Sequence, residues 1–309
     1  ANLVMGILNP DNFLGGKIQL SLQNSKDSIK PIADYFDMSI EEAALGIYRI
    51  VNASMAHLTS ETTVRKGIDP RDFTFISFGG AGCQHAVEVA REAKIPTILV
   101  PSSPSTFSAF GLLTADLKNT ATSTVMLPLS ISAIGTLADK FEGLETEARQ
   151  GLRGEESNIE RTYAEYILDI RYVGQHNEVA VYLKGKKDLA TDTIYAEFER
   201  AHQVLYGTRL GDSAEIVNAR VTVTGTVIPL ELARNEGRPS AHDPMPVGCR
   251  KVTHYTEEIP VFDRNDLRYG MTIPAPCIIE EDDSTLFIPE GCISSIDQFG
   301  NVLVQVPQE

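Results

Sequence analysis

Four consecutive small residues, Gly79, Gly80, Ala81 and Gly82, are the strongest candidates for binding chemistry in this sequence. Glycine has no Cβ, so a ligand can approach its backbone closely, and it adopts positive φ angles that other residues resist. Amides at the start of the following helix would then face the ligand. The loop has neither the G-x-G-x-x-G pattern of dinucleotide-binding proteins nor the Gly-Lys-Ser/Thr of a Walker A loop. From these residues alone, a tight strand-to-helix turn remains the alternative.

The elements around the loop would place it where open α/β sheets bind ligands. Residues 73–78, Phe-Thr-Phe-Ile-Ser-Phe, predict a buried strand, residues 84–93 predict a helix, and residues 97–100 predict a second strand. This order is a βαβ unit with the glycine loop at the carboxyl end of its first strand. Two polar residues near the loop, Gln84 and Asn52, are weaker candidates for contact with the same ligand.

No complete catalytic site is visible, so the catalytic residues stay unknown. The six histidines show no H-x-x-x-H or H-E-x-x-H spacing, and no G-x-S-x-G elbow occurs. The acidic run at 280–283 could hold a divalent cation, but such runs are usually solvated loops, and we assign no metal ligand. Cys83 adjoins the glycine loop and could be a reactive thiol. Several polar residues near strands of the second half are more consistent with satisfied core or interface groups than with catalysts: Arg171, Gln175, His202, Tyr206, Glu215 and Arg220.

Composition excludes some classes of partner. The 309 residues carry 27 Lys and Arg against 42 Asp and Glu, a formal charge of −15. Such an acidic surface disfavours nucleic acid and anionic membranes. No apolar run reaches the roughly 18 residues of a membrane-spanning helix. The four cysteines form no C-x-x-C pair, which indicates reduced thiols in a cytoplasmic protein.

The rest of the chain predicts an α/β protein of two domains, residues 1–118 and 119–309. Ser39 and Glu42 form a capping box ahead of a helix of around 25 residues. A helix over 105–115 carries small residues that allow close packing. Residues 116–122 look like a boundary, after which helices at 131–152 and 192–206 alternate with strands at 163–172, 178–183 and 216–228. The last sixty residues predict short strands separated by turns.

Several ordered motifs resemble the hydantoinase A/5-oxoprolinase family, which includes subunits of acetone and acetophenone carboxylases. They are Ala-Asn-Leu-Val-Met-Gly at 1–6, Val-Asn-Ala-Ser-Met at 51–55, Gly67 to Phe73, Phe78 to Gly82 with Gln84-His85-Ala86, Phe107 to Leu113, Arg171 to Gln175, His202 with Tyr206-Gly207, Glu215 to Arg220, Pro274 to Glu281, and Asp297 to Asn301. The resemblance covers essentially the whole chain.

The resemblance implies half of an ATPase core like those of actin, Hsp70 and acetate kinase, followed by a mixed α+β C-terminal domain. It implies that residues 79–82, with Gln84 and Asn52, lie on the adenosine side of an ATP cleft. Family members use ATP and Mg²⁺ to phosphorylate a carbonyl oxygen of a ketone or a cyclic amide, and a hydantoinase B-type subunit completes carboxylation or hydrolysis. Phosphoryl transfer depends mainly on positioning and charge neutralisation.

Three departures from the family shape the expectation. Family members are about twice as long, and their N-terminal phosphate loop has no match here. Thr59-Ser60-Glu61 replaces a usual basic pair, and Ser105 replaces a common glycine. We therefore expect the carboxyl half only, whether a split subunit, a truncated polypeptide or a proteolytic product.

This half would be inactive alone. We expect it to assemble with an N-terminal half or a paralogous subunit of the hydantoinase A type. Its apolar surface, notably along 107–113, would be covered in a hetero-oligomer. A noncatalytic scaffold subunit, or a fragment of an N-methylhydantoinase or 5-oxoprolinase, are the alternatives.

Overall fold

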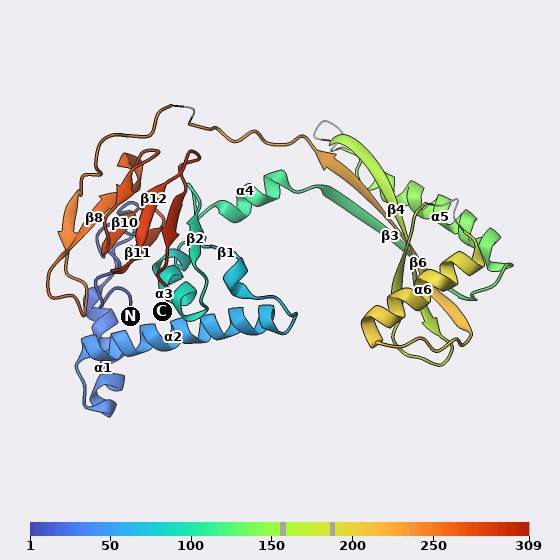
Figure 1. Ribbon diagram of the computed structural model, residues 1–309, viewed down its shortest axis with the longest axis horizontal. Coiled ribbons are helices and arrows are strands. Elements are labelled where there is room, and N and C mark those ends of the chain that lie inside the picture. Colours follow the sequence, from blue (N-terminus) through green and yellow to red (C-terminus); the bar gives the residue numbers. More distant parts are fainter. Residues whose placement is uncertain (155–158, 186–188, 236, 309) are drawn as a thin grey trace. The chain divides into compact units, whose positions relative to one another are not determined.

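The computed structural model describes residues 1–154, 159–185, 189–235 and 237–308 (Figure 1). Its contacts divide the chain into two compact units, one of Ala1–Gly111 with Glu231–Glu309 and the other of Leu112–Leu230. The sequence predicts a single domain over residues 119–309. In the structure the segment that begins at Glu231 belongs to the first unit instead. One reason is that β13 (Val302–Gln305) pairs antiparallel with β2 (Thr97–Val100).

A five-stranded sheet of the first unit contains the predicted βαβ unit. β1 (Thr74–Ile76) and β2 are parallel and are connected through α3 (Ala86–Glu92). The strand order is β1-β2-β13-β12-β9, with β9 at Thr272–Ile273 and β12 at Ile293–Ile296. β1 is shorter than the predicted 73–78, because Phe73 closes the 3-10 turn η1 (Pro70–Asp72) by donating its N–H to the Pro70 carbonyl.

A four-stranded sheet in the order β11-β10-β8-β7 completes the first unit. These strands span Thr285–Ile288 (β11), Cys277–Glu280 (β10), Ile259–Asp263 (β8) and Gly248–Arg250 (β7). Neighbouring residues of a strand point to opposite faces, so one strand serves two cores. Ile279 packs in the cluster that contains α3 and β2, whereas Ile278 packs in the cluster that contains the N-terminal residues, α1 (Leu22–Phe36) and α2 (Ile40–Val64).

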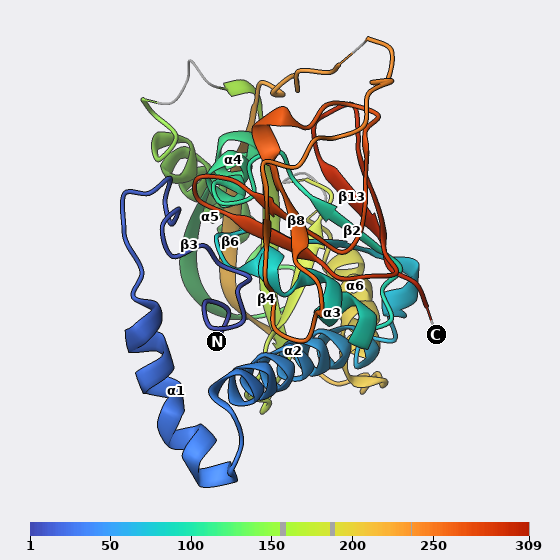
Figure 2. The ribbon, with the colours of Figure 1, turned by 90° about the vertical axis from the view of Figure 1, so that its left-hand side faces the viewer.

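The long helix α2 begins where the sequence predicts. The Ser39 side chain accepts from the Glu42 N–H and the Glu42 carboxylate accepts from the Ser39 N–H, which is the complete capping box. α2 packs against α1 and α3 (Figures 1 and 2). The boundary between the two units falls in α4 (Phe107–Thr114), in which no residue is buried.

The second unit is an antiparallel sheet with helices against one face. The strands β3 (Leu117–Pro128), β4 (Ile159–Tyr172), β5 (Val179–Leu183) and β6 (Ala214–Val227) follow the order β3-β6-β4-β5. Apolar residues of α5 (Ala133–Gln150) and α6 (Thr191–Tyr206) share one core with the inward residues of these strands. The predicted helices and strands of this region are present, with ends shifted by a few residues.

Polar residues of the second unit pair with one another. Nε of Arg171 donates to Glu215 at 2.8 Å, and Nη2 of Arg220 donates to Asp169 at 2.6 Å. His202 is buried, and its Nδ1 lies 2.8 Å from the Thr208 carbonyl oxygen. These contacts fit structural roles for Arg171, His202 and Arg220, which the sequence also favours, although the buried Nε of Arg220 has no hydrogen-bond partner.

No helix within the described ranges is both long enough and apolar enough to cross a membrane.

Candidate functional site

The glycine loop follows β1 directly, and one of its glycines has a backbone that requires this residue type. Gly79 has a φ of +88°, and a Cβ added there would meet no atom within 4 Å. Its N–H donates to the Pro104 carbonyl at 2.7 Å, which fixes the turn. Gly80 and Gly82 have no positive φ. Only Gly79 therefore needs glycine for its backbone conformation. At Gly80 and Gly82 the absence of a side chain leaves the backbone accessible.

A cleft of about 700 Å³ lies beside this loop. Gly80, Ala81 and Gln84 contribute to its wall, together with residues of the N-terminal segment such as Asn2 and Phe13. Its volume falls in the range of roughly 300–1,000 Å³ that is typical of small-molecule sites. Three of the predicted binding residues therefore meet at one concave surface.

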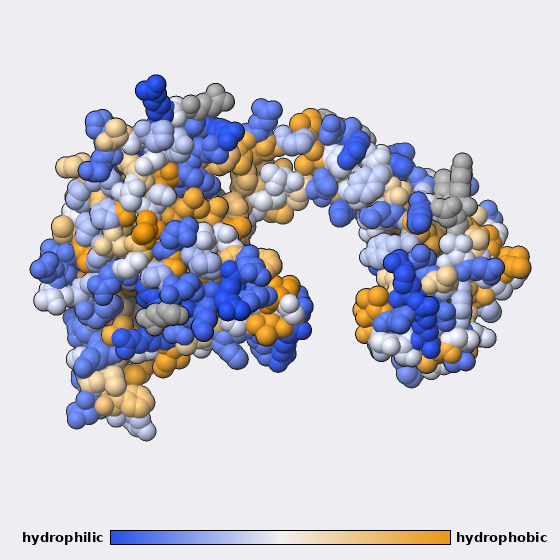
Figure 3. All heavy atoms as spheres, in the orientation of Figure 1, coloured by the Kyte–Doolittle hydropathy of each residue, from blue (hydrophilic) through white to orange (hydrophobic). Residues whose placement is uncertain are grey.

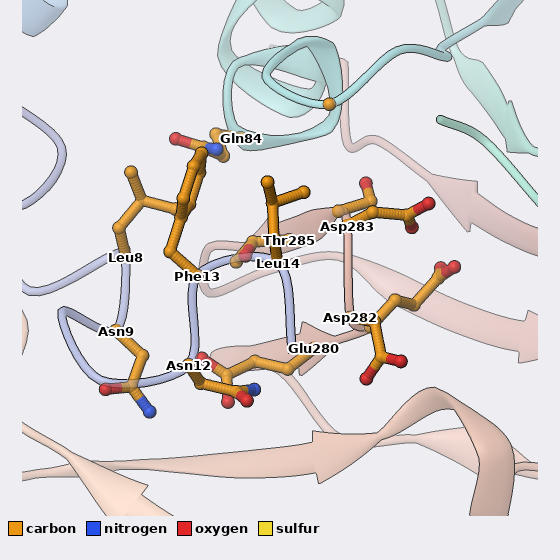
Figure 4. Close-up of a pocket in the computed structure, with 13 residues that line it drawn as sticks. Leu8, Asn9, Asn12, Phe13, Leu14, Gln84, Glu280, Asp282, Asp283 and Thr285 are labelled. Carbon is orange, nitrogen blue, oxygen red and sulfur yellow. The ribbon is translucent and has the colours of Figure 1, made fainter. Parts of the chain in front are cut away.

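A second, smaller pocket adjoins the cleft and has an acidic wall. Figure 4 shows Phe13 and Gln84 on one side of it and Asp282 and Asp283 on the other. Asp283 accepts a hydrogen bond from Ser105 Oγ at 2.5 Å. The Asp283 carbonyl would lie 3.4 Å from a Cβ at Gly80, so the acidic run closes directly on the glycine loop.

Three of the four carboxylates of the acidic run, those of Glu280, Glu281 and Asp283, contact other side chains of the protein. Glu280 forms an ion pair with Arg250 at 2.7 Å. Burial raises the pKa of Glu281 to about 7, although the Arg264 guanidinium 3.9 Å away acts in the opposite direction. Within the described ranges, no group of three His, Cys, Asp or Glu side chains could hold a metal ion.

A part-buried network of polar side chains adjoins the glycine loop. Nδ1 of His85 lies 2.6 Å from Asn52 Oδ1, and its Nε2 lies 3.0 Å from Asn2 Nδ2. Asn2 Nδ2 also donates to Gln84 Oε1 at 2.5 Å, and the Tyr48 hydroxyl donates to the Gln84 carbonyl at 2.8 Å. The Tyr48 and His85 rings stack with centroids 4.9 Å apart.

The network fixes the protonation state of His85. A carbonyl oxygen can only accept, so Nδ1 must carry the hydrogen toward Asn52, and Nε2 must accept from Asn2. Either charge state of the ring can donate from Nδ1, but Nε2 can accept only in the neutral ring, and burial lowers the pKa of His85 in the same sense. The predicted helix 84–93 is shorter in the structure, because the 3-10 turn η2 (Gly82–Gln84) is capped by His85 and α3 begins at Ala86.

Asn52 is only 3 % exposed and is committed to His85. Contact between Asn52 and a ligand therefore stays a prediction that this geometry does not favour, and a role in positioning the loop fits better. Gln84 is buried as well, but it borders both pockets. Asn2, Tyr48 and His85 are not among the predicted site residues, although Asn2 and His85 lie inside the motifs 1–6 and 84–86.

Cys83 does not have the properties of a reactive thiol. It is fully buried, and burial raises its pKa. All four cysteines are free, and only Cys249 is exposed.

Comparisons with known proteins match two family models and two curated relatives. The family model described as Hydantoinase/oxoprolinase matches residues 1–121, and the Hydantoinase/oxoprolinase C-terminal domain matches 129–303. An uncharacterized protein of Methanocaldococcus jannaschii is 33% identical over 99% of this chain and 44% of its own length. The caprolactamase subunit alpha of Pseudomonas jessenii is 30% identical over 96% of this chain and 44% of its own length.

Two solved structures share the fold. The ATP-dependent caprolactamase of Pseudomonas jessenii superposes with a TM-score of 0.69 at 28% identity, covering 98% of this chain and 46% of that one. Nucleotide-free acetone carboxylase, a structure concerned with ATP-dependent acetone carboxylation, gives a TM-score of 0.79 at 23% identity, covering 99% of this chain and 46% of that one. The chain thus spans less than half the length of these relatives.

Proposed function

Because the chain belongs to the hydantoinase/oxoprolinase family, we propose that it is one part of a multisubunit ATP-dependent enzyme that activates a carbonyl oxygen by phosphorylation. The substrate would be a small ketone, as in a carboxylase, or a cyclic amide, as in a hydrolase. Support comes from the relatives, since the caprolactamase and acetone carboxylase structures are both described as ATP-dependent.

The observation that carries the proposal is the open backbone of the glycine loop at a cleft of suitable size. In this proposal residues 79–82 form the adenosine side of the nucleotide site, and Gln84 lies at its edge. The Asn2–His85–Asn52 contacts hold the loop in place behind them. ATP would supply the phosphoryl group that turns the carbonyl oxygen into a leaving group or an enol phosphate.

The proposal assigns Mg²⁺ and the phosphate loop to the rest of the assembly. No metal cluster occurs among the residues that the structure describes. The relatives contain more than twice the length of this chain. An N-terminal hydantoinase A-type half or a paralogous subunit would therefore complete the site, and a hydantoinase B-type subunit would complete the reaction.

Nucleotide binding by matched glycine variants tests the assigned site. Gly67 has a φ of +71° and, like Gly79, open space at its Cβ position, but it follows α2, whereas Gly79 immediately precedes Gly80 and Ala81, which line the cleft. Valine at either position imposes the same backbone strain, on the order of 1–3 kcal/mol. In NMR titrations with AMP, Gly79→Val should weaken binding at least tenfold and Gly67→Val less than twofold.

Equal effects of the two substitutions, or no binding of AMP by the wild-type chain, would exclude the assigned loop. The isolated chain should also show no Mg²⁺-dependent ATP turnover, because it lacks the groups that place the γ-phosphate in line. Robust turnover in a preparation free of other subunits would contradict the half-site assignment.

A noncatalytic scaffold of the same complex is the second candidate. Thr59-Ser60-Glu61 in place of a basic pair favours it. If Gly79→Val leaves the turnover of the assembled enzyme unchanged, the scaffold is the better description.

A further inference from the structure

The segment that precedes α1 forms a loop whose two ends lie together. The Leu20 N–H donates to the Pro10 carbonyl at 3.0 Å, and Phe13 and Ile18 form an isolated β-bridge. Residues 10–20, which we call the arm, are therefore a compact surface loop of the Ω type, a class that often has a function. In Figure 2 the chain that leads into α1 runs along the outside of the unit.

The arm has few contacts with the rest of the first unit. Among the described residues, one hydrogen bond joins the arm to a residue distant in the chain, from the Gly15 N–H to the Asp282 carbonyl at 2.8 Å. Phe13 and Leu14 belong to none of the hydrophobic cores. A segment with few buried apolar contacts opens at a lower free energy than the unit that carries it.

The tip of the arm combines a left-handed backbone with a large side chain. Leu14, Gly15 and Gly16 have φ angles of +53°, +62° and +77°. Glycine adopts this conformation freely, whereas leucine rarely does. Leu14 is also 38% exposed, so burial in a core does not account for the leucine. Its side chain instead lines the cleft beside the glycine loop, as does that of Phe13, and backbone strain of this kind is found at ligand-binding loops.

The position of Phe13 and Leu14 distinguishes them from other exposed apolar side chains. Figure 3 shows apolar surface at the end of α2, where Val64 is 60% exposed, but Val64 is not among the residues that line the cleft. Figure 4 shows Phe13 and Leu14 projecting from the arm toward the side of the pocket where Gln84 lies.

The cleft is built for a neutral group. Among the described residues that line it, Asp283 has the only charged side chain, and the others are apolar or neutral. Proteins bind phosphate groups mainly with Arg and Lys side chains or with free amides at helix N-termini. The Asn24 N–H at the start of α1 already donates to Ser21 Oγ at 3.1 Å. Apolar and aromatic side chains instead bind the faces of a planar ring.

We propose that the arm closes the cleft over the neutral part of a nucleotide, its base and sugar. Phe13 and Leu14 contact the base from the side of the arm, and the glycine loop contacts it from the other side. The hydrogen bond between Gly15 and Asp282 holds the arm closed, and the phosphates extend toward the rest of the assembly. The ligand of the arm rests on the proposed function, whereas the role of the hydrogen bond does not.

Titrations of the 309-residue chain with adenosine, AMP and ribose 5-phosphate test the ligand. Adenosine should bind within threefold of AMP, because the lining side chains offer the phosphate no cation. Ribose 5-phosphate should bind at least tenfold more weakly than AMP. Adenosine should also slow amide exchange in peptides covering 10–20 at least fivefold, as measured by mass spectrometry, and should leave exchange in the second unit unchanged.

Three variants test the contacts of the arm. Phe13→Ala and Leu14→Asn remove apolar side chains from the cleft, and asparagine tolerates the left-handed backbone at position 14. Both should weaken adenosine binding at least tenfold. Ile18→Ala is the matched control, because Ile18 is an apolar residue of the arm, 47% exposed, that is not among the residues lining the cleft. It should change binding less than twofold.

Two glycine variants test the hydrogen bond that holds the arm, without any ligand. A Cβ at Gly15 would lie 3.1 Å from Cγ of Asp282, whereas a Cβ at Gly16 would lie 3.3 Å from the Asp11 carbonyl oxygen, inside the arm. Valine strains the backbone at both positions, but only Gly15→Val presses on Asp282. Exchange of residues 10–20 should be at least fivefold faster in Gly15→Val than in Gly16→Val, with α2 unchanged in both.

Equal exchange in the two valine variants, or a wild-type arm that exchanges as slowly as α2, would overturn the arm as a separately opening element. Unchanged adenosine binding in Phe13→Ala and Leu14→Asn would overturn its ligand contacts and leave the glycine loop as the site. AMP binding at least tenfold tighter than adenosine would overturn recognition of the neutral part. A wild-type chain that binds neither compound would refute the proposed nucleotide site and the ligand of the arm together, while the valine variants still decide how the arm is held.

Discussion

Removal of the Asn52 amide should destabilise the first unit through the histidine that it holds. Asn52 is 3% exposed, and its Oδ1 is the acceptor for the His85 Nδ1–H at 2.6 Å. In Asn52→Ala this part-buried donor loses its acceptor, and leaving such a group unsatisfied costs about 1–3 kcal/mol. We expect a total loss of about 2 kcal/mol.

A double-mutant cycle identifies the cause of that loss. In His85→Ala the donor is absent, so removing the Asn52 amide from this background should cost roughly 1 kcal/mol less than in the wild-type chain. Ser54→Ala is a control on the same helix, because the Ser54 hydroxyl bonds the Ile50 carbonyl at an exposed position. Its effect should stay below about 0.5 kcal/mol.

The assay must report on the first unit alone, because two compact units do not guarantee a single unfolding transition. Native-state hydrogen exchange of α2 peptides gives the opening free energy of that helix. Additive losses in the cycle, or an Asn52→Ala effect as small as that of Ser54→Ala, would refute the assignment of Asn52 to a positioning network. AMP affinity in Asn52→Ala then shows whether the residue also contacts the ligand.

Three further outcomes follow from local geometry. Ser39→Ala removes the N-cap of α2 and should lower the stability of the first unit by about 0.5–2 kcal/mol, measured by the same exchange experiment; an unchanged α2 would contradict the role of the capping box. The pKa of Glu281 is raised above the usual value of 4.5 to about 7, so the folded state favours the protonated form and stability should fall as pH rises from 4.5 through 7. Thermal unfolding at pH 5 and pH 8 should show a loss of roughly 2 kcal/mol in the wild-type chain and little loss in Glu281→Gln. A wild-type chain that is more stable at pH 8 than at pH 5 would contradict the raised pKa. Iodoacetamide should modify exposed Cys249 at least a hundredfold faster than buried Cys83, as followed by peptide mass spectrometry, whereas comparable rates would restore Cys83 as a reactive thiol.

Local signals predict the parts of this fold that are set by neighbouring residues. The capping box at Ser39 and Glu42 and the βαβ order around residues 79–82 are both present in the structure. The family could also be predicted from the sequence, because its motifs are short runs of neighbouring residues. The choice among adjacent glycines was not, because the sequence does not state which of them takes the positive φ that the structure assigns to Gly79.

The features that the sequence did not predict depend on contacts between residues far apart in the chain. The contact between Asn2 and His85 joins positions 83 residues apart, and that between Asn52 and His85 joins positions 33 residues apart. No periodicity or turn signal encodes such contacts, so the sequence suggested a ligand contact for Asn52 and gave no sign of its contact with His85. The predicted domain of residues 119–309 was wrong for the same reason, because no local signal in residues 302–305 indicates that they pair with β2.

The pairing of β13 with β2 has a consequence for synthesis on the ribosome. Val100 pairs with Val302, so about two hundred residues must be translated before β2 gains its second neighbour. At roughly 5–20 residues per second this takes on the order of 10–40 s. The complete sequence of the second unit, Leu112–Leu230, is translated within that interval, and its sheet and core need no residue outside it. The second unit can therefore fold before the first is complete. Until β13 is translated, one edge of β2 stays unpaired, and chaperones that bind nascent chains would have to cover it.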